Sequence, residues 1–163
     1  MDTFARPAHP ASPRAAAAYL VGLRPVLADA TAGRRALVRS LRGLGDDVRR
    51  GGPMVAARAG AVGAERIRTF RALRDRLDGA AAPPSCGACR LTLGRWFDRL
   101  IDCCEVLRSV GTTGDAGRLG RAESLLAEAG EYARGFNAEH AALVGELREL
   151  VDAAAERVRL PVR

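Results

Sequence analysis

The clearest guide to the fold of this chain is the stretch Cys86–Val110, CGACRLTLGRWFDRLIDCCEVLRSV. Its apolar residues recur at alternating steps of three and four, which places them on one face of a helix. These residues are Cys86, Cys89, Leu93, Trp96, Leu100, Cys103, Leu107 and Val110. A half-buried strand would alternate apolar and polar residues instead. We therefore expect an amphipathic helix over about 85–110.

In the rest of the chain, the same spacing predicts helices over about 13–44, 53–79 and 115–160. The first begins with Ser12 as an N-cap and Pro13 at the first helical position, and Pro25 is expected to kink it. Glycine and proline separate the segments, and Asp115 or Thr113 is the expected cap of the last helix. No segment of the sequence has the alternation of a strand.

Four heptad-patterned helices joined by short turns predict an all-α fold. The expected architecture is an antiparallel up-down-up-down four-helix bundle over residues 13–160, preceded by a flexible N-terminal tail at 1–12. The second and third helices would be about 40 Å long, whereas the overlong fourth helix would reach on the order of 65 Å. The fourth helix should therefore extend past the others at one end.

That overhanging end carries an apolar stripe, which rarely stays exposed to water. We predict an interface there for a second copy of the chain or for a helical protein partner. Its residues are Leu147, Leu150, Val151 and Val158, with Leu160 beyond them. The alternative is that the N-terminal tail folds back over the stripe.

Composition limits the class of protein. The 163 residues are 48% hydrophobic and 28% charged, which suits one domain with a real core. No apolar run approaches the ~20 residues that a membrane-spanning helix needs, and the N-terminus does not resemble an export signal. We therefore expect a cytoplasmic protein whose four cysteines are not a disulfide framework.

The basic residues are all arginine, and their distribution is uneven. Residues 1–80 hold 15 Arg against 7 acids, whereas residues 81–163 hold 11 Arg against 12 acids. Exclusive arginine use is partly a sign of GC-rich codon bias, which weakens the charge as a functional signal. A nucleic-acid-binding edge is nevertheless a second hypothesis, at Arg35, Arg39, Arg42, Arg49 and Arg50. No aromatic residue lies among these arginines for base stacking.

The cysteines allow a third hypothesis. Cys86, Cys89 and His140 fall at one level of the bundle and could hold zinc or another soft metal, with water, His9 or a carboxylate as fourth ligand. Cys103 lies about 21 Å from Cys89 along a continuous helix, too far to join them. A redox role for the C-x-x-C pair is another alternative. Buried cysteines that pack as small hydrophobic residues are the simplest interpretation.

No nucleotide-binding loop, zinc-protease helix, di-iron motif or catalytic triad occurs, so we expect no catalytic site. Arg34 and Arg66 fall at otherwise apolar positions and are expected to extend their charged ends toward solvent. His140 is expected to be a core histidine with satisfied nitrogens. The leading functional hypothesis is therefore a non-enzymatic interaction or assembly protein.

Overall fold

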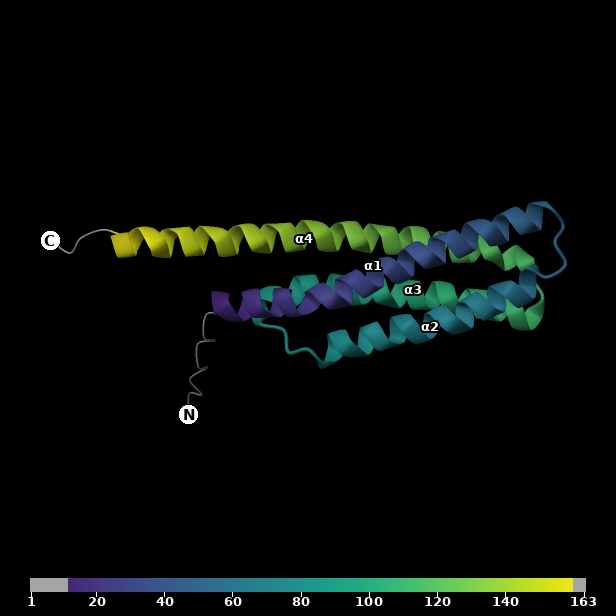
Figure 1. Cartoon of the computed structure of the whole chain (residues 1–163), viewed down its shortest axis with the longest axis horizontal. Coiled ribbons are helices and arrows are strands. Elements are labelled where there is room, and N and C mark those ends of the chain that lie inside the picture. Colours follow the sequence, from purple (N-terminus) through teal and green to yellow (C-terminus); the bar gives the residue numbers. More distant parts are fainter. Residues whose placement is uncertain (1–11, 160–163) are drawn as a thin grey trace, which may run out of the picture.

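The computed structural model describes residues 12–159, and these form four long helices without a strand (Figure 1). The helices are α1 (Pro13–Arg49), α2 (Val55–Gly79), α3 (Gly87–Thr113) and α4 (Leu119–Arg159). Short 3-10 turns, η1 (Pro84–Cys86) and η2 (Ala116–Arg118), precede α3 and α4. The predicted all-α class is confirmed. The predicted tail at 1–12 lies outside the described residues, apart from Ser12.

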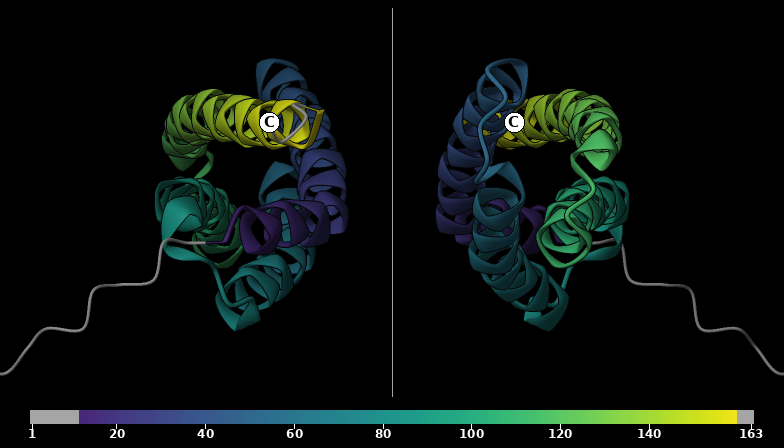
Figure 2. Two further views of the ribbon diagram at one scale, coloured as in Figure 1. Left: turned by 90° about the vertical axis from the view of Figure 1, so that its left-hand side faces the viewer. Right: turned by 90° about the vertical axis from the view of Figure 1, so that its right-hand side faces the viewer.

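Each helix runs opposite to the one before it, so the bundle has the predicted up-down-up-down order (Figure 1). The most extensive contacts are those of α3 with α2 and α4. Helix α1 packs on α2 and contacts α4 only sparsely. It crosses the bundle obliquely, so that its first turns lie on the side of α2 and α3 and its last turns lie beside α4 (Figure 2).

Helix α1 continues past its expected end at residue 44. Gly43 and Gly45 remain helical, and Leu44 between them is buried in the core. The backbone N–H of Arg50 closes the helix by donating to the carbonyls of Asp46 and Asp47. The chain turns only at Gly51, whose positive φ of 68° suits glycine. Burial of the last apolar turn therefore outweighs the weak helix propensity of the two glycines.

Helix α3 also ends later than expected, at Thr113. The capping residue is Gly114 in the left-handed conformation, and its N–H donates to the carbonyl of Val110 at 2.9 Å. Asp115 then caps the start of η2, because its Oδ1 accepts a hydrogen bond from the backbone N–H of Gly117. This confirms Asp115 as one of the two expected caps.

The core is a continuous apolar seam between the four helices. Every residue of the apolar stripe predicted for 85–110 is buried, so that prediction is confirmed. Phe70 of α2 and Phe97 of α3 are the largest side chains that are fully buried. Because apolar residues occupy only one side of each helix, no helix in the described part of the chain is apolar enough to cross a membrane.

Small residues bring α2 and α3 unusually close together. Gly60 and Gly63 of α2 face the backbone of α3, where Gly111 lies against Gly60. Glycines inside a helix normally weaken it by about 1 kcal/mol each relative to alanine. Here they allow two backbones to approach where side chains would keep them apart.

Candidate functional site

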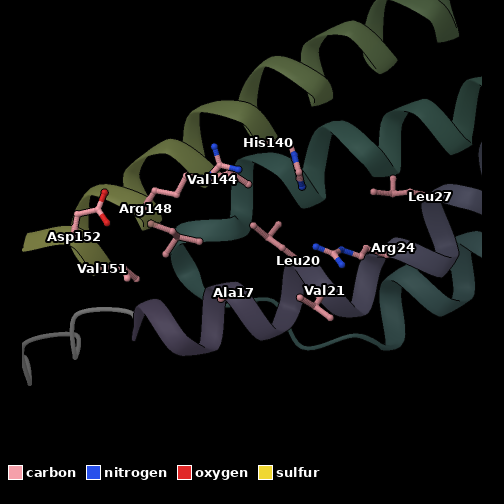
Figure 3. Close-up of a pocket in the computed structure, with 11 residues that line it drawn as sticks. Ala17, Leu20, Val21, Arg24, Leu27, His140, Val144, Arg148, Val151 and Asp152 are labelled. Carbon is pink, nitrogen blue, oxygen red and sulfur yellow. The ribbon is translucent and has the colours of Figure 1, made fainter. Parts of the chain in front are cut away.

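A groove runs between the first half of α1 and the second half of α4, with a volume of about 550 Å³ (Figure 3). Eleven residues line it, and most of them are apolar. They are Ala17, Leu20, Val21, Arg24 and Leu27 from α1, and His140, Val144, Leu147, Arg148, Val151 and Asp152 from α4. The groove therefore lies at the end of the bundle where α1 begins and α4 ends.

The groove exists because α4 extends beyond the start of α3. Thr92, near that start, donates a hydrogen bond to Oε1 of Glu139 on α4 at 3.1 Å. Antiparallel helices rise equally, so Gly87 lies level with about residue 144 of α4. The remainder of α4, about 22 Å long, passes the end of α3, and across the groove it faces only α1. Figure 1 shows this segment as the free end of α4.

The groove is apolar inside and charged at its edges. Val21 on one wall is 55% exposed and Val151 on the other is 64% exposed, so both present hydrocarbon to solvent. Arg24 lies on the α1 side, with Arg148 and Asp152 on the α4 side (Figure 3). An apolar centre with a polar rim is the usual anatomy of a protein docking surface.

The structure places two of the four residues predicted as an interface in the groove. Leu147 and Val151 line the groove. Leu150 lies outside it and is 53% exposed. It is seven residues after the buried Leu143 and so lies on the same face of α4, at a level that α3 does not reach. The side chain of Val158 lies outside the part of the chain whose side chains are described.

Sequence reasoning did not find the α1 wall of the groove. It located the surface on α4 alone, whereas Ala17, Val21 and Arg24 supply the opposite side. The available signal was Val21, an apolar residue that falls beside the stripe of Leu20, Leu23 and Leu27 rather than in it.

The residues proposed as metal ligands do not come together. Within residues 12–159, no group of three or more His, Cys, Asp or Glu side chains is placed to hold a metal ion. Cys86 and Cys89 are buried in the seam of α3. His140 instead lines the groove, half-buried, with its ring centroid 5.7 Å from that of Phe136. His9 lies outside the described residues.

The thiols are shielded rather than activated. Burial raises the pKa of Cys86 against the opposing effect of a hydrogen bond with Ser85. Burial and then the nearby charge of Glu139 raise the pKa of Cys89. A redox-active C-x-x-C would need the opposite shift. Burial also raises the pKa of Cys103 to about 12, and its Sγ donates to the carbonyl of Ala122 at 3.3 Å. All four thiols therefore have the properties of core residues.

The five arginines of the predicted nucleic-acid edge are all exposed: Arg35, Arg39, Arg42, Arg49 and Arg50. Arg49 is paired with Asp46 on the same helix. The other four have no carboxylate of the described residues within ion-pair distance. The edge therefore keeps most of its positive charge uncompensated.

The two arginines of the apolar seams are half-buried. A terminal guanidinium nitrogen of Arg34 lies near Gly130 of α4, and Arg66 forms an ion pair with Glu65 at 3.2 Å. The Nε of each is buried without a hydrogen-bond partner in the described part of the chain. The end of the Arg66 side chain therefore reaches a carboxylate, whereas Arg34 has no ion pair among the described residues.

Function must be argued from this geometry. Comparison with protein-family models, with characterised proteins and with solved structures gives no match for this chain.

Proposed function

We propose that this chain is a non-enzymatic helical-bundle assembly protein that self-associates through the end of α4 and the α1–α4 groove. The observation that carries the proposal is the unpartnered apolar surface at one end of the bundle. It comprises the groove and the adjacent exposed Leu150. Elsewhere in the bundle the same helical stripes are buried against neighbouring helices.

The energetic case rests on the exposed hydrocarbon. Val21, Leu150 and Val151 are each more than half exposed. Complete burial of a side chain of this size contributes about 1.5–3 kcal/mol relative to exposure, so a partner that covers all three gains a few kcal/mol. A continuous apolar face of this kind favours association over solvation.

The occupant that fits best is the end of α4 from a second copy. Its apolar residues, among them Val144, Leu147, Leu150 and Val151, form a face wider than a two-helix seam, which suits packing among several helices. The part of α4 beyond α3 is about 22 Å long, and the α1 wall from Ala17 to Leu27 is about 15 Å long. One molecule therefore carries both a groove and a protruding helix long enough to span its α1 wall, as a two-fold symmetric dimer requires.

The lining of the groove supports binding rather than bond-breaking chemistry. Its lining includes a single histidine, His140, and contains no hydroxyl or thiol. The buried thiols of α3 do not belong to it. Neither the groove lining nor the buried thiols supply an activated nucleophile.

Light scattering over a range of protein concentrations tests this proposal. The expected mass is twice the 17.2 kDa of the monomer. Leu147→Glu with Leu150→Glu should convert the protein to a monomer, because it places two charges in the apolar surface. Circular dichroism verifies that the variant remains helical.

Leu91→Glu is the matched control, because Leu91 of α3 is 57% exposed and lies outside the groove. This variant should assemble like the parent chain. A parent chain that is monomeric at every concentration refutes self-association. Equal dissociation of the control and the double variant refutes the location of the interface.

A further inference from the structure

The outer face of α1 carries a row of arginines along its whole length, which we name the α1 arginine ridge. At 100° per residue its members fall within a sector of about 80°, roughly opposite the buried face of the helix. They are Arg14, Arg24, Arg35, Arg39 and Arg42 on the helix and Arg50 at its C-cap, and all are exposed. The ridge extends the edge expected from sequence by two arginines toward the start of α1.

The arginines of the ridge lack ion-pair partners in the described part of the chain, unlike most of those on α2 and α3. Among the arginines of α1 in the described part of the chain, only Arg49 forms an ion pair, and its partner is Asp46 of the same helix. The other two acids of α1, Asp29 and Asp47, are paired with Arg76 and Arg58 of α2. The ridge therefore has no carboxylate of its own to neutralise it.

Helices α2 and α3 show the contrasting pattern. Among the described residues, every arginine of these two helices except Arg68 and Arg95 lies within ion-pair distance of a carboxylate. Codon bias would raise the number of arginines on every helix alike. It does not explain why the uncompensated ones gather on one face of α1.

The length and composition of the ridge define its ligand. From Arg14 to Arg50 the ridge measures about 54 Å, which is far longer than a small anion requires. Guanidinium groups bind phosphate oxygens through two donors at once. The ridge includes no aromatic side chain on which unpaired bases could stack. A long row of phosphate binders without stacking groups fits the backbone of a stiff duplex.

We propose that the α1 arginine ridge binds the phosphate backbone of duplex nucleic acid without reading its sequence. Arg35, Arg39 and Arg42 form the centre of the contact and lie away from the α1–α4 groove. The ridge is therefore independent of the proposed assembly, except at Arg24, which belongs to both surfaces.

The test is fluorescence anisotropy of a labelled DNA duplex of random sequence, titrated with the full chain at several salt concentrations. The slope of log K against log salt reports the number of phosphates contacted, about 0.9 for each. Arg35→Gln with Arg39→Gln and Arg42→Gln should weaken binding to all sequences alike. The magnitude of the slope should fall by about 3, one unit for each arginine removed.

The control is Arg68→Gln with Arg95→Gln and Arg108→Gln, which removes the same charge from exposed arginines of α2 and α3, away from the ridge and from the end of α4. Its slope should stay close to that of the parent chain. An equal loss in both triple variants would show that net charge alone attracts the duplex, and would overturn the proposal. Absence of binding at low salt would also overturn it, as would tighter binding of a single strand or displacement of the duplex by an equal charge of polyglutamate.

Discussion

Gly63→Ala tests whether the close approach of α2 to α3 is essential to the bundle. An added Cβ at this position would lie 2.5 Å from the backbone nitrogen of Arg108 and 2.6 Å from the carbonyl oxygen of Cys104. Both obstructing atoms belong to the backbone of α3. No side-chain rotation can therefore make room, and the two helices must move apart.

Two opposing effects set the magnitude. Alanine inside a helix is more favourable than glycine by about 1 kcal/mol. Overpacking a close-packed interface costs about 1–3 kcal/mol, and the upper end applies because the obstruction is backbone. The net loss of unfolding free energy is therefore about 2 kcal/mol. For a chain of this size we expect the melting temperature to fall by about 4–8 °C.

Gly22→Ala is the matched control. Gly22 also lies inside a helix, but no atom lies within 4 Å of a Cβ built there. Only the propensity effect operates, so the variant should gain about 1 kcal/mol and melt about 2–4 °C higher. Urea and thermal unfolding followed by circular dichroism measure both shifts.

The two variants should thus change stability in opposite directions. If Gly63→Ala is as stable as the parent chain, α2 and α3 are not in backbone contact. If both variants become more stable by the same amount, helix propensity alone governs these positions. Either result would contradict the backbone contact at Gly63.

Two further predictions concern the buried thiols. Burial raises the pKa of Cys103 from 9.0 to about 12. Between these two pH values the unfolded chain releases the thiol proton while the folded chain keeps it. The contribution of Cys103 to stability is therefore complete below about pH 9 and is lost as the pH rises toward 12. Unfolding free energies should therefore fall above about pH 9, by about 1.4 kcal/mol per unit for this thiol, and Cys103→Ala should show a shallower decline; equal slopes would contradict this. Alkylation of the native chain at neutral pH should leave all four cysteines intact on a timescale that modifies the urea-unfolded chain fully, as mass spectrometry can show. Rapid labelling of Cys86 or Cys89 would mean that the start of α3 opens readily.

Much of the architecture could be predicted because helical periodicity is a local property. The stripe from Cys86 to Val110 is spaced for one helical face, and the structure buries all of it. The ends of α1 and α3 were less predictable. Leu44 and Val110 are buried at their tips, and packing extends each helix to the next glycine in the left-handed conformation, Gly51 or Gly114.

The candidate site was predictable only on one side. The length of the fourth helix, read against the third, placed an unpartnered apolar end near Leu147 and Val151. The opposite wall at Val21 depends on the oblique path of α1, which no short stretch of sequence encodes. The level match of His140 with Cys86 located the histidine near the start of α3, but the direction of its side chain depends on the rotation of α4.

The sequence alone therefore determined that four amphipathic helices form, that they pair by their apolar faces and that the last one is too long for its neighbours. These features follow from residue spacing and length along one chain. The tertiary structure decided which surfaces of different helices meet. It showed that Gly60 and Gly63 allow a close backbone contact between α2 and α3. It also showed that most arginines of α2 and α3 lie beside carboxylates, whereas among the described arginines of α1 only Arg49 does. The physical reason is that such contacts depend on the distance and rotation between helices, which sequence spacing within one helix does not specify.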